Sequence, residues 1–450
     1  MMRLSWTQPE DLLPHALVAA DLDGRDAAGA RRRWTDAGGS PEPVVSGASP
    51  QPAPEHLRTL ARELLTELDE LPDPPNLILD EPDDLDAILE GAAAPALPDI
   101  ADAAYADRVH GAWLGRAAGC LLGKPVEKLP LHAIRAIARD TGNWPLAGYF
   151  TEVGLDPALA AAHPWNRRSR PTSLAENIDG MPEDDDLNFP LIALHLLEGT
   201  GRGFTTGDVA QAWLDLLPGG RVFTAERITY RNLLDGYEPE QAGKVRNPFQ
   251  DWIGAQIRTD LYGWTAPGDP LDAARLAWTD ARLSHGRNGI YGAMFAAAAS
   301  AAAVAGASVD AVLETGLAVV PARSRYAGAV RRGMELGRGE LDDESAIDAL
   351  HEEYGHLHWV HVLNNAALLG FALARGAGDF ERTITLAVSG GWDTDSVGAT
   401  AGALTGALAG AKHLPRNWID PLDDRLATSV PGFDGARFTA LAIRTVEVSR

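Results

Sequence analysis

The chain is poor in cysteine and in basic residues, and each shortage excludes a class of protein. Its 450 residues include one cysteine, Cys120, so neither an intramolecular disulfide nor a cysteine-rich zinc site can form. Lysine and arginine total 39 against 63 aspartate and glutamate, a formal net charge of -24. Proteins that bind nucleic acid neutralise its phosphates with basic groups. We therefore expect no nucleic-acid partner and, with no disulfide to maintain, a cytoplasmic location.

Long apolar segments are also scarce. The N-terminal sequence MMRLSWTQPEDLLPH has Pro9, Glu10 and Asp11 where the apolar core of an export signal would lie. The most membrane-like stretch, residues 293–304, is alanine-rich and too short to span a bilayer. We expect no export signal and no membrane partner, and a buried helix at 293–304.

The composition changes near residue 100. Residues 40–55, SPEPVVSGASPQPAPE, are too rich in proline and glycine for a helix or a central strand, whereas leucines 57, 60, 64, 65 and 68 have helical spacing. Beyond residue 100, segments rich in alanine, leucine and arginine are separated by short glycine, proline and aspartate breaks. We predict an extension over residues 1–100, which covers or regulates the rest or contacts a partner protein, and an all-α domain over 101–450.

Glycine recurs every fourth residue in two segments, at positions 111, 115, 119 and 123 and again at 398, 402, 406 and 410. Each set lines one face of a helix. Because glycine inside a helix costs roughly 1 kcal/mol relative to alanine, close approach of a neighbouring backbone must offset the cost. The two stripes predict a tightly packed central pair of helices.

Acidic residues stand beside these helical segments. Glu127 follows the first stripe, Asp393, Asp395 and Ser396 open the second, and residues 183–186 read Glu-Asp-Asp-Asp after a proline. Taken alone, the run at 183–186 could be a solvated helix start favoured by the helix dipole. Together, the three elements favour a bound cation, and their oxygen ligands favour magnesium, manganese or calcium over zinc or copper.

Four segments occur in a familiar order, namely GAWLGRAAGCLLGKPVE, EDDDLNFPLIALHLLE, SHGRNGIYGAMFAAAASAAA and GGWDTDSVGATAGALTGA. Over about residues 105–412 the chain resembles the ADP-ribosylglycohydrolase family. The resemblance implies an all-α, orthogonally packed helical bundle with two magnesium ions, for which manganese could substitute. It also implies hydrolysis of the glycosidic bond between ADP-ribose, or a related ribosyl group, and an acceptor such as a protein side chain.

The resemblance further implies roles for individual residues. Asp393 is the first candidate for the base that activates water, and Glu127 is the second, as a gate that orients substrate or water. Two residues depart from the family pattern: Glu183 replaces the usual threonine, and Trp392 is inserted before the acidic motif. The implied metal ligands are Glu183, Asp184, Asp185, Asp393, Asp395 and Ser396. The implied substrate contacts are His285, Asn288, Gly289, Tyr291 and Trp392.

Two other functions stay open at this stage. The same metals could serve a hydrolase of a free nucleoside or another ribosyl metabolite, in which case nucleosides would be turned over and ADP-ribosyl compounds would not. Alternatively, the chain could be a non-catalytic module that binds ADP-ribose or metal, in which case binding would occur without turnover.

Overall fold

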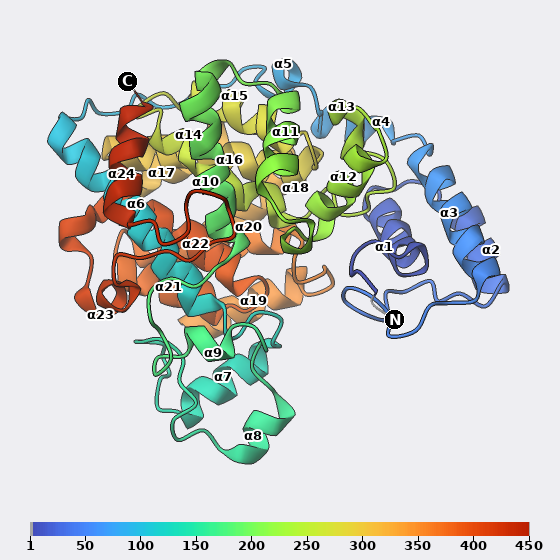
Figure 1. Cartoon of the computed structure of the whole chain (residues 1–450), viewed down its shortest axis with the longest axis horizontal. Helices are drawn as coiled ribbons and strands as arrows, with labels where there is room; N and C mark the ends of the chain where they lie inside the picture. Colours follow the sequence, from blue (N-terminus) through green and yellow to red (C-terminus); the bar gives the residue numbers. More distant parts are fainter. Residues whose placement is uncertain (1–2, 450) are drawn as a thin grey trace.

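A computed structural model describes residues 3–449, and within that range the chain is helical and contains no β-strand (Figure 1). The all-α prediction is confirmed. The extension contains α1 (Pro9–Leu22), α2 (Ala28–Asp36), α3 (Glu55–Asp69), α4 (Pro75–Asp80) and α5 (Leu85–Ile88).

The remainder of the chain is built on two central helices with the other helices arranged around them (Figure 1). Short 3-10 turns are labelled η. In chain order the elements are α6 (Asp102–Gly123), α7 (Leu131–Asp140), α8 (Pro157–Ala162), α9 (Arg170–Ser173), α10 (Asp185–Thr200), η1 (Gly201–Gly203), α11 (Thr206–Leu216), η2 (Gly219–Arg221), α12 (Thr224–Leu234), α13 (Pro239–Ala242), η3 (Ile253–Arg258), α14 (Asp260–Trp264), α15 (Pro270–Ala281), α16 (Arg287–Ala305), α17 (Val309–Ala318), α18 (Arg325–Arg338), α19 (Asp343–Tyr354), α20 (Val362–Gly376), α21 (Phe380–Ser389), α22 (Thr394–Ala409), η4 (Ala411–His413), α23 (Arg416–Ile419), η5 (Asp420–Leu422) and α24 (Phe438–Glu447).

The central pair consists of α6 and α22, which pack glycine against glycine. A Cβ atom on Gly115 would lie 2.1 Å from the carbonyl oxygen of Gly402, and one on Gly119 would lie 1.9 Å from that of Gly398. No side chain fits between backbones this close. The predicted tight helix pair is confirmed.

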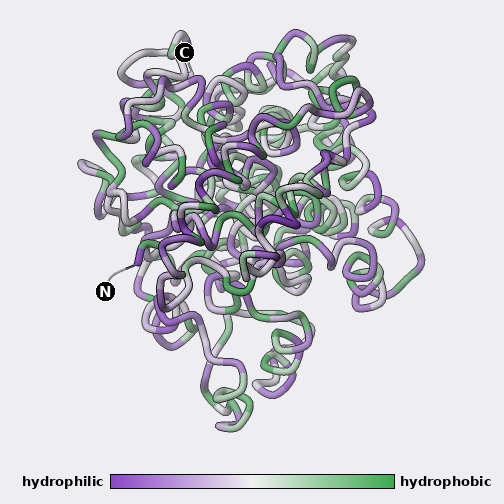
Figure 2. Tube along the Cα trace, turned by 90° about the vertical axis from the view of Figure 1, so that its right-hand side faces the viewer, coloured by the Kyte–Doolittle hydropathy of each residue, from purple (hydrophilic) through white to green (hydrophobic). Residues whose placement is uncertain are grey.

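The alanine-rich helix α16 runs through the interior. It is long and apolar enough to cross a membrane by length and composition, yet its whole apolar window is buried inside the protein. The outer helices differ from it, because hydrophilic and hydrophobic residues follow one another in short runs along them (Figure 2). Such helices each bury one face and leave the other in solvent. The prediction of a buried helix at 293–304 is confirmed.

The extension packs against the rest of the chain through an aromatic cluster. The ring of Trp6 lies 5.4 Å from that of Phe249 and 5.5 Å from that of Trp252, and the ring of His15 on α1 lies 5.6 Å from that of His358. Edge-to-face aromatic contacts of this kind add to the free energy of burial. The extension is therefore anchored at its N-terminal end.

A second anchor is ionic and involves the end of the extension. The carboxylate of Glu81 accepts hydrogen bonds from the Arg325 guanidinium at 2.7 Å and from the Asn288 amide at 2.7 Å. The backbone carbonyl of Pro82 accepts a hydrogen bond from the Tyr291 hydroxyl at 2.6 Å. Residues 81–82 thus lie over the starts of α16 and α18.

Candidate metal centre and substrate cleft

The glycine pairing ends where the acidic residues begin. The hydroxyl of Thr394, the first residue of α22, donates a hydrogen bond to the backbone carbonyl of Gly123, the last residue of α6, at 2.8 Å. Lys124 and Glu127 follow α6 directly, and Asp393 precedes α22. The close approach of the two helices therefore brings these acidic segments together.

A first group of carboxylates consists of Glu127, Asp393 and Asp395, each of which offers an oxygen within 4.8 Å of the others. Asn166 donates a hydrogen bond to Glu127 at 2.7 Å, and the Lys128 ammonium lies 3.1 Å from the same carboxylate. Burial, followed by the charge of Asp395, raises the pKa of Asp393 well above its ordinary value. Burial and the charge of Glu127 raise the pKa of Asp395 to about 7. The group resists full ionisation because burial disfavours the charged carboxylates and because their charges repel one another.

A second group consists of Cys120, Asp184 and Asp186, again with one ligand atom each within 4.8 Å. Asp184 caps α10 by accepting the backbone N–H of Asp186 at 3.0 Å, and the Ser396 hydroxyl donates to the Asp186 carboxylate at 3.2 Å. Although burial opposes its ionisation, the adjacent Lys124 ammonium lowers the pKa of Asp184. The second group is thereby tied to the start of α22.

Arg116 on α6 contacts the second group from the protein interior. It is fully buried, and its guanidinium donates to the Asp186 backbone carbonyl at 2.7 Å and to the Asp260 carboxylate at 2.6 Å. A buried arginine holds its geometry firmly when its donors are satisfied by planar acceptors. Arg116 therefore fixes where α10 begins relative to α6 and α14.

The donor set fits a hard divalent cation. Asp185 adds a further carboxylate, and burial together with the charges of Asp184 and Asp395 raises its pKa well above the ordinary value. Buried carboxylates that repel one another are stabilised by a bound cation, and oxygen donors are the ligands that Mg²⁺ and Mn²⁺ prefer. These acidic clusters could hold metal.

The Glu183 side chain belongs to neither of the two groups and binds other residues in this structure. Its carboxylate pairs with the Arg221 guanidinium at 3.0 Å and accepts the backbone N–H of Ser429 at 3.1 Å. It still lines the same cleft as the other predicted ligands. For its carboxylate to join a cation, the side chain would have to leave Arg221.

The five predicted substrate contacts do not line the carboxylate cleft, although Trp392 directly precedes Asp393 in the chain. His285 is 2% exposed and shares a hydrogen bond with its neighbour Ser284 at 2.8 Å. Asn288 and Tyr291 bind residues 81–82 of the extension, as described above. Gly289 packs against the backbone of Gln250, and Trp392 is stacked on the ring of His351 at 4.0 Å. None of the five lines the cleft. The extension thus covers Asn288 and Tyr291, two of the five residues that were expected to contact substrate.

The carboxylates lie in a large cleft of about 1220 Å³. One part of its wall is basic and carries Arg167, Arg168 and Arg221. Another part comes from the extension, at residues 5–6 and 46–47, and Arg227 holds this wall by donating to the Ser5 backbone carbonyl at 3.1 Å. The cleft thus combines a negatively charged floor with a positively charged wall.

Several of these residues escaped sequence reasoning. Lys124 stands one residue beyond the first glycine stripe, and Asp186 is the fourth acid of its run, so both carried a positional signal. Arg116 lies among the glycines of α6, where nothing marks it as a partner of Asp186. The cleft arginines at 167 and 168 come from a turn and that at 221 from the 3-10 turn η2, and none of these segments shows a motif.

The fold and the clustered carboxylates together define a helical protein with an acidic, oxygen-donor site. The chain belongs to the ADP-ribosylglycohydrolase family, whose sequence model matches residues 101–449. It is 27% identical over 314 residues to an uncharacterized protein of Archaeoglobus fulgidus, a match that covers 69% of this chain and 90% of that protein. It is also similar to a solved structure titled ADP-ribosylglycohydrolase-related protein complex, at 24% identity and a TM-score of 0.48, over 77% of this chain and 99% of that one. Family membership supports a hydrolase-like function on a glycosidic bond.

Proposed function

We propose that the protein is a magnesium-dependent hydrolase that cleaves the bond between ADP-ribose, or a related ribosyl group, and an acceptor. The observation that carries the proposal is that two clusters of largely buried acidic side chains lie on the floor of a cleft whose wall bears three arginines. A ribosyl diphosphate has matching features, since its hydroxyls and anomeric carbon suit the acidic floor and its phosphates suit the guanidinium groups.

Cleavage of a ribosyl bond passes through a transition state that resembles an oxocarbenium ion. Carboxylates near the anomeric carbon stabilise its positive charge, and a carboxylate that accepts a proton from water makes that water a better nucleophile. Asp393 is the proposed base, and Glu127, held by Asn166 and Lys128, would orient water or substrate. Both belong to the same carboxylate group, so either can reach a water bound there.

The metal ligands in this proposal come from both groups. When bound, Mg²⁺ or Mn²⁺ would supply positive charge that ionises the clustered carboxyls and polarises nearby hydroxyls and water. Asp186 joins the set predicted from the sequence because it shares a cluster with Asp184. Lys124 supplies a positive charge of its own beside Asp184. The proposed ligands are Glu183, Asp184, Asp185, Asp186, Asp393, Asp395 and Ser396.

The extension is proposed to restrict the acceptor. Residues 5–6 and 46–47 form part of the cleft wall, yet they lie outside the part of the chain that the family model matches. A wall contributed by a segment outside the family region narrows the approach to the carboxylates. We therefore favour a small acceptor over the surface of a folded protein.

The metal site is tested by calorimetric titration of Mg²⁺ and Mn²⁺ into the full chain. Asp395→Asn removes a charge from the first carboxylate group and should weaken metal binding at least tenfold. Asp99→Asn is the matched control, because Asp99 is exposed and lies outside the cleft. If Asp395→Asn bound metal as tightly as the Asp99→Asn control, the carboxylates would not be ligands and the proposal would fail.

A further inference from the structure

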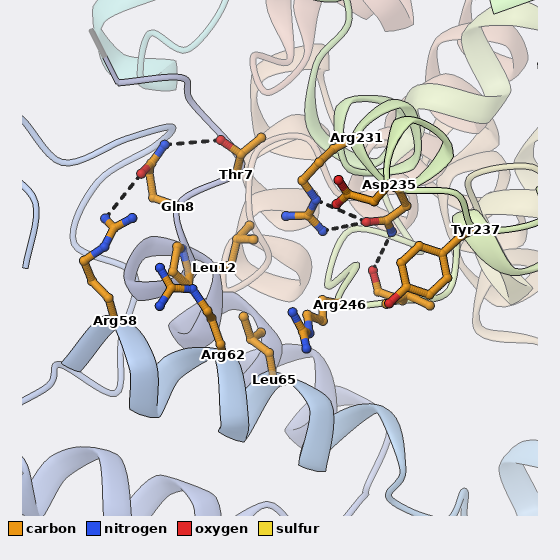
Figure 3. A pocket seen from close by; sticks show the side chains of 13 residues that line it. Thr7, Gln8, Leu12, Arg58, Arg62, Leu65, Arg231, Asp235, Tyr237 and Arg246 are labelled. Atoms are coloured by element: carbon orange, nitrogen blue, oxygen red, sulfur yellow. Dashed lines mark hydrogen bonds between the residues drawn. The ribbon is translucent and has the colours of Figure 1, made fainter. Parts of the chain in front are cut away.

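A second cavity, of about 390 Å³, lies between the extension and the rest of the chain, away from the carboxylate cleft (Figure 3). Helices α1 and α3 supply one side of it, and the end of α12 with the segment that follows supplies the other. Its polar lining is dominated by arginine, which is unexpected in a chain with a net charge of -24. The lining includes Arg58, Arg62, Arg231 and Arg246, with Asp235 and Tyr237.

The two arginines from α3 are partly neutralised. Arg58 pairs with the buried Glu10 at 2.7 Å, and one terminal nitrogen of Arg62 lies 3.1 Å from Glu55. The side chain of Arg62 is 42% exposed, and its remaining nitrogens have no bond to another described side chain. Arg62 can therefore still bind an anion that enters the cavity.

The two arginines on the opposite side donate hydrogen bonds from their guanidinium groups to neutral partners. The Arg231 guanidinium donates to the Asn232 amide oxygen at 2.9 Å, and that of Arg246 donates to the Thr66 hydroxyl at 3.0 Å. Within residues 3–449, neither guanidinium has a carboxylate within 4.0 Å. Burial lowers the pKa of Arg231, the negative charge of Asp235 opposes this effect, and the positive charge of Arg246 adds to it. The fold thus holds two guanidinium groups near each other, with the carboxylates of Asp235 and Asp69 in their surroundings but in no direct ion pair with them.

Such an arrangement is favourable once an anion joins it. A guanidinium group forms paired, charge-assisted hydrogen bonds with phosphate, and the volume is that of a small-molecule pocket. Asp235 would repel a bare anion but can accept a hydrogen bond from a sugar hydroxyl, and the Tyr237 ring, 39% exposed, is available to stack on a base. Figure 3 shows these two side chains beside Arg231 at one end of the cavity.

We propose that this cavity is a second ligand site, separate from the carboxylate cleft, and that it binds a nucleoside diphosphate. The arginines would hold the diphosphate, with Asp235 at the ribose and Tyr237 at the base. Because the walls come from both the extension and the rest of the chain, the ligand would hold the two together.

The site is also placed to influence the cleft. Thr7 and Gln8 line the second cavity, and the preceding residues Ser5 and Trp6 line the cleft. A ligand that fixes Thr7 and Gln8 would fix the neighbouring cleft wall. The second site would then regulate access to the cleft. This regulatory role rests on the proposed function, whereas the proposal that the second site binds a ligand does not.

The test is calorimetric titration of ADP and, separately, inorganic pyrophosphate into the full chain with a chelator present, so that the carboxylate cleft binds no metal. Arg231→Gln and Arg62→Gln should each weaken ADP binding at least tenfold. Arg275→Gln, an exposed arginine on α15, should leave it unchanged, and Arg221→Gln reports any ADP that is bound in the cleft instead. An unchanged far-ultraviolet circular dichroism spectrum and melting temperature would show that each variant is folded. Because Arg62 is exposed, Arg62→Gln is less able than Arg231→Gln to disturb the fold.

Each outcome of this titration supports or overturns part of the proposed second site. ADP binding that is tighter than pyrophosphate binding and is lost in both cavity variants supports a nucleoside diphosphate site. Equal binding of pyrophosphate and ADP would overturn the assignment of ribose and base to Asp235 and Tyr237. Absence of ADP binding, or loss only in Arg221→Gln, would overturn the second site while leaving the proposed hydrolase function intact.

Discussion

Replacing Gly402 with alanine should separate the central helices. The added Cβ atom would lie 2.1 Å from the carbonyl oxygen of Gly115, so α6 and α22 must part by about 1 Å to restore a contact of 3.0 Å. Forcing an extra methyl into a packed core costs about 1–3 kcal/mol, and backbone on a rigid helix favours the upper end. Alanine recovers about 1 kcal/mol through its higher helix propensity. We expect a net loss of about 2 kcal/mol in the free energy of unfolding.

The matched control is Gly328→Ala in α18, where an added Cβ meets no atom within 4 Å. That variant should gain up to about 1 kcal/mol from helix propensity alone. Urea unfolding followed by circular dichroism would measure both, and Mg²⁺ titration would report the carboxylates that follow the two helices. If Gly402→Ala proved as stable as Gly328→Ala, the glycine pairing would not be the reason for these glycines.

Three further perturbations follow from the structure. Arg116→Met leaves the Asp260 carboxylate buried without its cation and should lower the free energy of unfolding by about 3–5 kcal/mol. A decrease of less than about 1 kcal/mol, measured by urea unfolding, would contradict the buried ion pair. Burial lowers the pKa of His15 from 6.5 to about 4, so as the pH falls His15 takes up a proton first in the undocked extension. The free energy of docking should therefore fall by about 2 kcal/mol between pH 8 and pH 5, which would be seen as faster proteolysis near residues 40–54 at pH 5. Equal cleavage at both pH values would refute this. Arg221→Gln should raise KM for an ADP-ribosyl substrate about tenfold with little change in kcat, whereas an unchanged KM would remove Arg221 from phosphate recognition.

Much of the helical framework could be predicted because its signals are local. Leucine spacing predicted the helix that the structure has at Glu55–Asp69, and the fourfold glycine spacing predicted the pairing of α6 with α22. Glu127, Asp393 and Asp395 stand at the ends of that pair, so their gathering followed from the same pattern, whereas the acidic run at 183–186 belongs to the start of α10. The positions of carboxylates at helix ends were therefore visible in the sequence.

What escaped prediction depends on which face of a buried helix meets which neighbour. Helix α16 is apolar all round, so its sequence gives no sign that Asn288 and Tyr291 face the extension rather than the cleft. The second cavity joins Arg62 to Arg231, which are far apart in sequence and share no motif. Only the packing of the extension brings such residues together.

The most direct test of the proposed hydrolase function is the release of ADP-ribose from ADP-ribosyl-arginine, an ADP-ribosyl-serine peptide and O-acetyl-ADP-ribose, each assayed with Mg²⁺ and with a chelator. We predict Mg²⁺-dependent release from at least one of the three, and its loss in Asp393→Asn. Release that is unaffected by the chelator, or no release from any substrate by a protein that binds Mg²⁺, would contradict the proposed function.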